Sequence, residues 1–149
     1  MTHRATVICH ASFCHRSKAG GWATWINVNG PAGEHVRIKE SGTFKRRPKT
    51  STHAEQLACM IGIWLAYRNG ARDILVQTDC LSLVTERGYI GAQGAREFRM
   101  ATVDYWPEAS VHWRHVKGHT AGEDARSWVN NWCDAHAKRH MRKQRGNNR

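Results

Sequence analysis

The chain has 149 residues, of which 40% are hydrophobic and seven are tryptophan. This length suits one domain that can bury a core without disulfides. The net charge of +11 arises from 23 Lys and Arg against 12 Asp and Glu, and it favours nucleic acid as a partner, with an acidic membrane surface as the alternative. No segment is apolar enough to span a bilayer and none resembles a signal peptide, so we expect no membrane partner and a cytoplasmic location.

Apolar periodicity and turn signals divide the chain into strands and helices. Strand 74–78 follows a helix, which favours parallel pairing, whereas the first three strands follow one another directly and favour antiparallel pairing. The pattern predicts an α/β fold with a mixed five-stranded sheet, three antiparallel strands and then two parallel ones, flanked by helices. In chain order we predict strands at 4–13, 21–29 and 35–40, a helix at 52–68, a strand at 74–78, helices at 80–87 and 95–106, a strand at 111–116 and a last helix that contains 125–133.

The domain organisation is simple. We assign 1–140 to a single domain and 141–149 to a basic, mobile C-terminal tail, because the residues beyond 140 are mostly Arg, Lys, Gln, Asn and Gly. We expect the protein to be a monomer.

Five cysteines are scattered along the chain without a framework of the secreted type, which favours reduced thiols. Two pairs, Cys9-His10 and Cys14-His15, place four soft ligands close together in sequence. A zinc site is one interpretation of these pairs. The other is a strand, on which neighbouring side chains point to opposite faces and do not converge on one ion.

Three carboxylates occupy positions with two interpretations each. Asp79 follows the buried strand 74–78, and ligands of α/β sheets collect at such carboxyl ends, but Asp79 is also a suitable N-cap for the next helix. Glu55 lies at the start of a helix, where Thr52-x-x-Glu55 matches a capping box. Asp134 lies beside the apolar stripe of the last helix, and a lone aspartate there is commonly a solvated charge.

Several short motifs fall in one order along nearly the whole chain, from about residue 5 to residue 139. In this order and spacing they resemble ribonuclease H, type 1. The motifs are Cys9-His10-Ala11-Ser12 with Gly20-Gly21-Trp22, Ala54-Glu55, Thr78-Asp79, Trp113, Val116-Lys117-Gly118-His119, and Asn130 to Asp134.

The resemblance implies an endonuclease that hydrolyses the RNA strand of RNA/DNA hybrids with two divalent ions, Mg²⁺ or Mn²⁺. It implies that Asp79 and Asp134 bind the metal that activates water, that Glu55 helps bind the metal near the leaving group, and that His119 relays protons or aids product release. His119 is alternatively an ordinary histidine of a surface loop. Clustered carboxylates suit this chemistry because the phosphate gains charge in the transition state.

One position departs from the family. His10 stands where the family has a carboxylate that contacts both metals, and we include it among the catalytic and metal-binding residues. An imidazole offers one ligand nitrogen and removes a negative charge, and Mn²⁺ accepts nitrogen better than Mg²⁺. We therefore expect an enzyme that prefers Mn²⁺ or is impaired, or else an inactive module that binds hybrids or duplexes. A related nuclease or integrase acting on DNA is a third interpretation, which Glu55 and the loop ending at His119 disfavour.

Residues before helix 52–68 supply candidate contacts to nucleic acid, although a solvated surface is the alternative. Residues 80–110 are too few for the basic helical handle that many members of the family carry there, so we expect the basic tail to supply that charge. The candidate nucleic-acid-binding residues are Lys45, Arg46, Arg47, Thr50, Ser51 and, by resemblance, Asn130.

Overall fold

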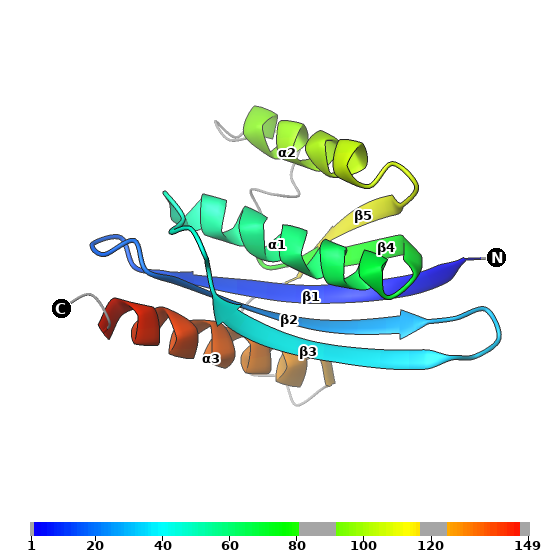
Figure 1. Cartoon of the computed structure of the whole chain (residues 1–149), viewed down its shortest axis with the longest axis horizontal. Coiled ribbons are helices and arrows are strands. Elements are labelled where there is room, and N and C mark those ends of the chain that lie inside the picture. The colour runs from blue at the N-terminus through cyan, green and yellow to red at the C-terminus, as the bar shows by residue number, and fades with distance from the viewer. Residues whose placement is uncertain (1, 81–91, 117–124, 147–149) are drawn as a thin grey trace.

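The computed structural model describes residues 2–80, 92–116 and 125–146, and Figure 1 shows its strands and helices. The predicted helix at 80–87 and His119 lie outside these residues, except for residue 80 of the helix. None of the described helices has the length and apolar character that crossing a membrane would require. In chain order, the elements are β1 (His3–Phe13), β2 (Gly20–Asn29), β3 (His35–Thr43), α1 (Ser51–Arg68), β4 (Ala71–Thr78), α2 (Ala92–Tyr105), β5 (Ser110–His115) and α3 (Ala125–Gly146).

The five strands form one mixed sheet in the order β3-β2-β1-β4-β5. β1 pairs antiparallel with β2, and β2 with β3, whereas β4 pairs parallel with both β1 and β5. This confirms the predicted sheet. β3 is longer than predicted and reaches Thr43, because Ser41, Gly42 and Thr43 continue the ladder opposite Ala23, Trp22 and Gly21.

Helices cover both faces of the sheet, with α1 on one side and α3 on the other (Figure 1). Because side chains alternate along a strand, β1 contributes to two cores. Val7 and Cys9 belong to the core under α1, whereas Ile8 packs with Cys133 of α3. Cys9 lies 3.2 Å from Cys59, sulfur to sulfur, while the next residue, His10, bonds to α3. The Cys-His pairs therefore do not converge as a zinc site.

The start of α1 corrects the predicted capping box. The helix begins at Ser51, and its N-cap is Thr50, whose hydroxyl oxygen accepts a hydrogen bond from the backbone N–H of His53 at 3.0 Å. Glu55 is therefore not the third helical residue that a capping box requires. Its side chain is left available for contacts across the sheet.

The end of α3 corrects the predicted boundary after residue 140. The helix continues to Gly146, so residues 141–146 are its last turns and not a separate tail, while 147–149 lie outside the described residues. Met141 is buried. Gly21 of β2 permits this packing, because a Cβ there would lie 2.1 Å from the carbonyl oxygen of Ala137. The close approach of α3 to β2 therefore explains why the sequence carries glycine at this position.

Candidate functional site

His10 lies near the end of β1 and is 4% exposed. Its Nε2 lies 3.1 Å from Oδ1 of Asn130 on α3, and its Nδ1 lies 3.5 Å from Oδ2 of Asp79, just beyond the end of β4. Both ring nitrogens of His10 thus face oxygen atoms of other segments. His10 therefore links the two segments that carry the other candidate residues.

Glu55 reaches this region from the opposite face of the sheet. Its Oε1 accepts a long hydrogen bond of 3.4 Å from the backbone N–H of Ala11, and its Oε2 is buried with no hydrogen-bond partner in the described part of the chain. Burial, chiefly, together with the charges of Asp79 and Asp134 raises the pKa of Glu55 from 4.5 to about 8, against the smaller lowering effect of the Ala11 bond. The three carboxylates therefore interact electrostatically.

Asp134 completes the cluster from α3. Its carboxylate forms an ion pair with Lys138, one turn later, at 3.0 Å, and the side chain of Asp134 is 26% exposed. The half-buried Asp79 lies next to His10. We call His10, Glu55, Asp79 and Asp134 the acidic cluster; its members come from β1, α1, α3 and the residue after β4. The sequence alone placed these four residues in four separate predicted elements, and the fold brings those elements together.

The chemistry of the acidic cluster fits a hard divalent cation. Three carboxylates supply the oxygen ligands that Mg²⁺ prefers, and the unpartnered Oε2 of Glu55 is an oxygen that a cation would satisfy. Within the described residues, however, no group of three or more His, Cys, Asp and Glu side chains is arranged closely enough to hold a metal ion. In this arrangement, contacts to His10 and Lys138 occupy Asp79 and Asp134.

Three contacts of the acidic cluster differ in how far the sequence predicts them. Asn130, which we predicted to contact nucleic acid, is instead 5% exposed and bonded to His10. Lys138 was not predicted, although its spacing of four residues from Asp134 is typical of helical ion pairs. The backbone N–H of Ala11 leaves no signal, because its bond to Glu55 depends on the fold.

The other predicted contacts to nucleic acid lie between β3 and α1. Lys45, Arg46, Thr50 and Ser51 are exposed. Arg47 is also exposed, and its guanidinium donates to the backbone carbonyl of Ser17 in the β1–β2 turn. The structure leaves the charges of Lys45 and Arg46 facing solvent next to the first turn of α1.

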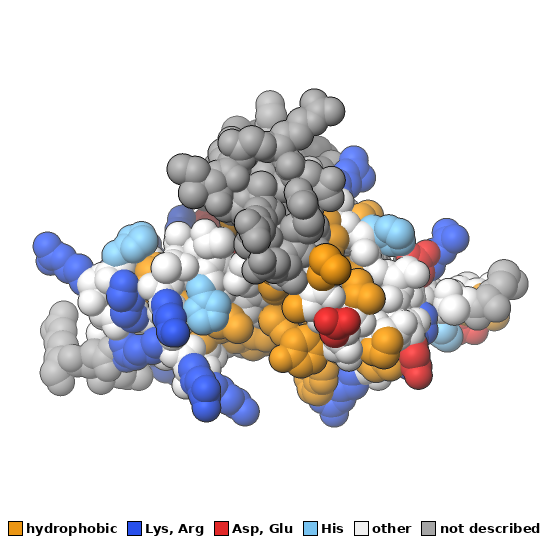
Figure 2. Space-filling model, turned by 90° about the horizontal axis from the view of Figure 1, so that it is seen from above, with side chains coloured by type: hydrophobic (Ala, Val, Ile, Leu, Met, Phe, Trp, Pro, Cys, Tyr) orange, Lys and Arg blue, Asp and Glu red, His pale blue; other side chains and the backbone are white. Residues whose placement is uncertain are grey.

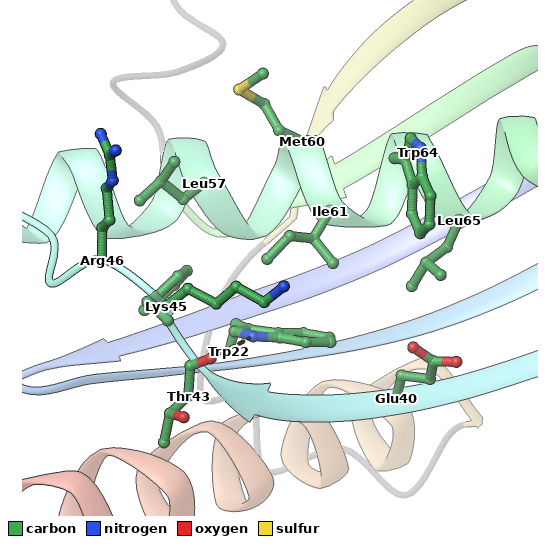
Figure 3. A pocket seen from close by; sticks show the side chains of 11 residues that line it. Trp22, Glu40, Thr43, Lys45, Arg46, Leu57, Met60, Ile61, Trp64 and Leu65 are labelled. Atoms are coloured by element: carbon green, nitrogen blue, oxygen red, sulfur yellow. Dashed lines mark hydrogen bonds between the residues drawn. The ribbon is translucent and has the colours of Figure 1, made fainter.

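A groove of about 490 Å³ runs between α1 and the strands β2 and β3. Its lining is mainly apolar, and in Figure 3 Ile61 and Leu65 point from α1 toward Trp22, whereas Met60 points away. Lys45 and Arg46 also line it. No member of the acidic cluster is among the described residues that line the groove, so it is separate from the candidate metal ligands.

The raised pKa of Glu55 predicts a pH-dependent stability for the metal-free protein. Between pH 4.5 and about 8 the folded state holds a proton on Glu55 that the unfolded state has lost, so the free energy of unfolding should fall as pH rises through this window, by on the order of a few kcal/mol. Urea denaturation in a metal chelator at several pH values measures this fall. Glu55→Gln should remove most of this pH dependence, whereas the control Glu40→Gln, at an exposed position on β3, should keep it. The prediction is contradicted if the free energy of unfolding of Glu55→Gln falls with pH as steeply as that of the original protein.

Comparisons with known proteins agree with this fold. The sequence model of the family described as reverse transcriptase-like matches residues 10–87. No curated protein sequence matches. Among solved structures, RNase H1 from the halophilic archaeon Halobacterium salinarum is 17% identical with a TM-score of 0.62, and the alignment covers 94% of this chain and 98% of that one.

Two further structures give the same result. LC9-RNase H1, a type 1 RNase H with the type 2 active-site motif, is 16% identical with a TM-score of 0.68, over 97% of this chain and 74% of that one. LC11-RNase H1, crystallised with an RNA/DNA hybrid, is 11% identical with a TM-score of 0.58, and the alignment covers 93% of this chain and 97% of that one. At these identities the likeness shows the fold alone, which is RNase H-like.

Proposed function

Because the chain belongs to the reverse transcriptase-like family, we propose that it is a metal-dependent endonuclease that hydrolyses the RNA strand of RNA/DNA hybrids. The similar structures are RNase H1 proteins, and one of them was crystallised with such a hybrid.

The observation that carries the proposal is the convergence of Glu55, Asp79 and Asp134. They come from helices on opposite faces of the sheet and from the segment that follows β4, and the pKa of Glu55 is raised by burial and then by the other two charges. Keeping three carboxylates close together, one of them buried, destabilises a protein unless a cation or proton compensates. Such a cluster therefore favours a catalytic interpretation over a structural one.

We assign roles to the residues as follows. Asp79, Glu55 and Asp134 would bind two divalent ions, Mg²⁺ or Mn²⁺, and His10 would contribute one ring nitrogen. Such ions, when bound by these residues, would lower the pKa of a water molecule and would stabilise negative charge on the phosphate oxygens. Asn130 holds the ring of His10 by a 3.1 Å bond, so the nitrogen facing Asp79 keeps its direction. His119 is the proposed proton relay, and Thr50 and Ser51 the proposed phosphate contacts.

The assay that tests the function measures cleavage of a labelled hybrid by the purified protein with each metal. We expect the RNA strand to be cut, faster with Mn²⁺ than with Mg²⁺, because Mn²⁺ accepts the nitrogen of His10 more readily. A DNA duplex and an RNA duplex of the same sequence are the controls and should remain intact. Cleavage of the DNA duplex would instead support a DNA nuclease, and no cleavage of any substrate would contradict the proposal.

A second candidate function is an inactive module that binds hybrids or duplexes. The position of His10 favours it, because the imidazole lies 3.5 Å from Asp79 and already partners a carboxylate that a metal would need. Tight binding of the hybrid without cleavage by either metal would support this alternative.

A further inference from the structure

The net charge of the chain is concentrated at one end of the molecule. Three segments meet there: the β1–β2 turn with its flanks at 14–20, the segment 44–49 before α1, and the last turns of α3 at 139–146. Together they carry ten of the 23 Lys and Arg residues and no Asp or Glu. We call these three segments the basic end. The rest of the chain is therefore nearly neutral despite the overall charge of +11.

Hydrogen bonds hold the three segments together. The side chain of Gln144 accepts from the backbone N–H of Gly20 at 2.7 Å and donates to the backbone carbonyl of Phe44 at 3.3 Å. Arg47 donates to the carbonyl of Ser17. Gly20 allows this contact, because a Cβ there would lie 2.8 Å from the ring of Phe44. The basic end is therefore assembled by the fold and does not consist of independent flexible runs.

The charged side chains of the basic end face solvent. Arg142, Lys143 and Arg145 are all exposed. Figure 2 shows Lys and Arg gathered at the left end, where Figure 1 places the β1–β2 turn, the start of α1 and the end of α3, while the acidic side chains visible in this view lie mainly in its right half. Beside them, a hollow of about 350 Å³ is lined by Gly42, Thr43, His140, Lys143 and Gln144.

His140 lies within the positive electrostatic field of the basic end. Its Nε2 lies 2.9 Å from the hydroxyl oxygen of Ser41. Desolvation first, and then the charges of Arg139 and Lys143 with His136, lower the pKa of His140 below its usual value. A phosphate near this hollow would meet cations on α3 and a polar wall from β3.

We propose that the basic end binds the phosphate backbone of duplex nucleic acid at a distance from the acidic cluster, and so anchors the flank of a long hybrid. The inference rests on the proposed function for the identity of the duplex. Arg145 lies about 16 Å along α3 from Asp134, at about 1.5 Å per residue. At one phosphate per 3.4 Å of each strand, this distance corresponds to roughly five base pairs.

The distance makes the anchoring depend on substrate length. A hybrid of about six base pairs, centred on the acidic cluster, would not reach the basic end, whereas one of about 24 base pairs would. Contacts to phosphate alone carry no sequence information, so the effect should be equal for hybrids of different sequence.

The test uses a variant of the full chain, Arg142→Gln/Lys143→Gln/Arg145→Gln. It keeps the buried Met141 and Gln144, which a deletion of the last helical turns would remove. The control, Arg37→Gln/Lys39→Gln/Arg68→Gln, removes the same charge from exposed positions on β3 and at the far end of α1. Binding is measured by fluorescence anisotropy with a metal chelator, so that no strand is cut, and circular dichroism confirms that both variants are folded.

For the long hybrid we expect the first variant to bind roughly 10- to 100-fold more weakly at low salt, and the slope of log K against log salt to become shallower by about 2 to 3. The short hybrid and the control variant should change far less. The proposal would be overturned if the two variants lost equal affinity for the long hybrid, or if the first variant lost as much affinity for the short hybrid as for the long one.

Further outcomes distinguish the proposal for the basic end from the proposed endonuclease activity, and nucleic-acid binding from membrane binding. Absence of cleavage together with length-dependent binding would reject the endonuclease and keep the basic end as a nucleic-acid surface. If Arg142→Gln/Lys143→Gln/Arg145→Gln cleaves the hybrid and also binds the long hybrid as well as the original protein does, the endonuclease is kept and the role of the basic end is rejected. Vesicles containing phosphatidylserine are the remaining probe, and loss of vesicle binding without loss of hybrid binding would assign the surface to membranes and overturn the proposal.

Discussion

Asp79→Asn should reduce hydrolysis of the hybrid by on the order of 10²–10³-fold, the usual cost of removing one group that stabilises charge in a transition state. The amide keeps the shape of the side chain but loses the negative charge that a divalent ion needs. Glu55→Gln should have a loss of similar size, because it removes the buried carboxylate. Single-turnover cleavage at saturating Mn²⁺ measures both effects.

Asp73→Asn is the matched control for this experiment. Asp73 also belongs to β4, but it forms an ion pair with Arg4 and lies 3.5 Å from the imidazole of His112 on the neighbouring strands, outside the acidic cluster. The control should retain cleavage within a few-fold. Normal cleavage by Asp79→Asn would contradict the assignment of this carboxylate to catalysis, and binding of the hybrid, measured separately, tells a loss of chemistry from a loss of affinity.

His10→Asp should raise cleavage with Mg²⁺ by at least about tenfold and lower the preference for Mn²⁺. The aspartate adds an oxygen ligand and a negative charge between Asp79 and the end of β1. It also removes the bond from His10 to Asn130, so the metal-free variant should melt at a lower temperature than the original chain and recover with Mg²⁺. Rates with each metal and melting temperatures with and without Mg²⁺ test this result.

His10→Asn separates charge from shape in this comparison. It supplies a neutral oxygen donor of nearly the size of aspartate and should not produce the gain with Mg²⁺. A similar gain for both variants would show that removal of the imidazole, and not the added carboxylate, matters. Unchanged metal preference in His10→Asp would contradict the proposed place of His10 among the metal ligands.

Local pattern predicted the fold well and the ends of its elements poorly. The alternation of Val36 and Ile38 with charged residues marks β3, but Gly42 gives no strand signal, and pairing with β2 alone extends the strand to Thr43. Similarly, Thr50 and Thr52 are both suitable caps by residue type, and the structure uses Thr50. Such boundaries depend on tertiary pairing, which a short window of sequence does not contain.

The last turns of α3 show what a composition rule misses. Residues 141–146 are almost all polar, and such segments are commonly disordered. Their order comes from Met141, which is buried, and from Gln144, whose two partners are backbone groups of residues more than 90 positions away. A single polar side chain that bonds to distant backbone leaves no pattern that sequence reasoning can detect.

The candidate site was predictable only as a set of separate positions. Order and spacing identify Glu55, Asp79 and Asp134 through their resemblance to ribonuclease H, but each has an ordinary interpretation by itself. The orphaned oxygen of Glu55 and the contact of His10 with both Asp79 and Asn130 arise from the packing of three segments on the sheet. These features support the proposed catalytic interpretation, and they depend on tertiary structure that a linear sequence does not contain.

The outer strands of the sheet have a consequence for the behaviour of the protein in concentrated solution. Among the described strands, β3 lies at one edge of the sheet with nine residues, and His35, Arg37 and Lys39 alternate along it. A second molecule that added its own β3 in antiparallel register would bring the cationic side chains of Arg37 and Lys39 from the two molecules close together, which opposes growth of the sheet from one molecule into the next. The cations of β3 thus protect the free protein from aggregating through this edge.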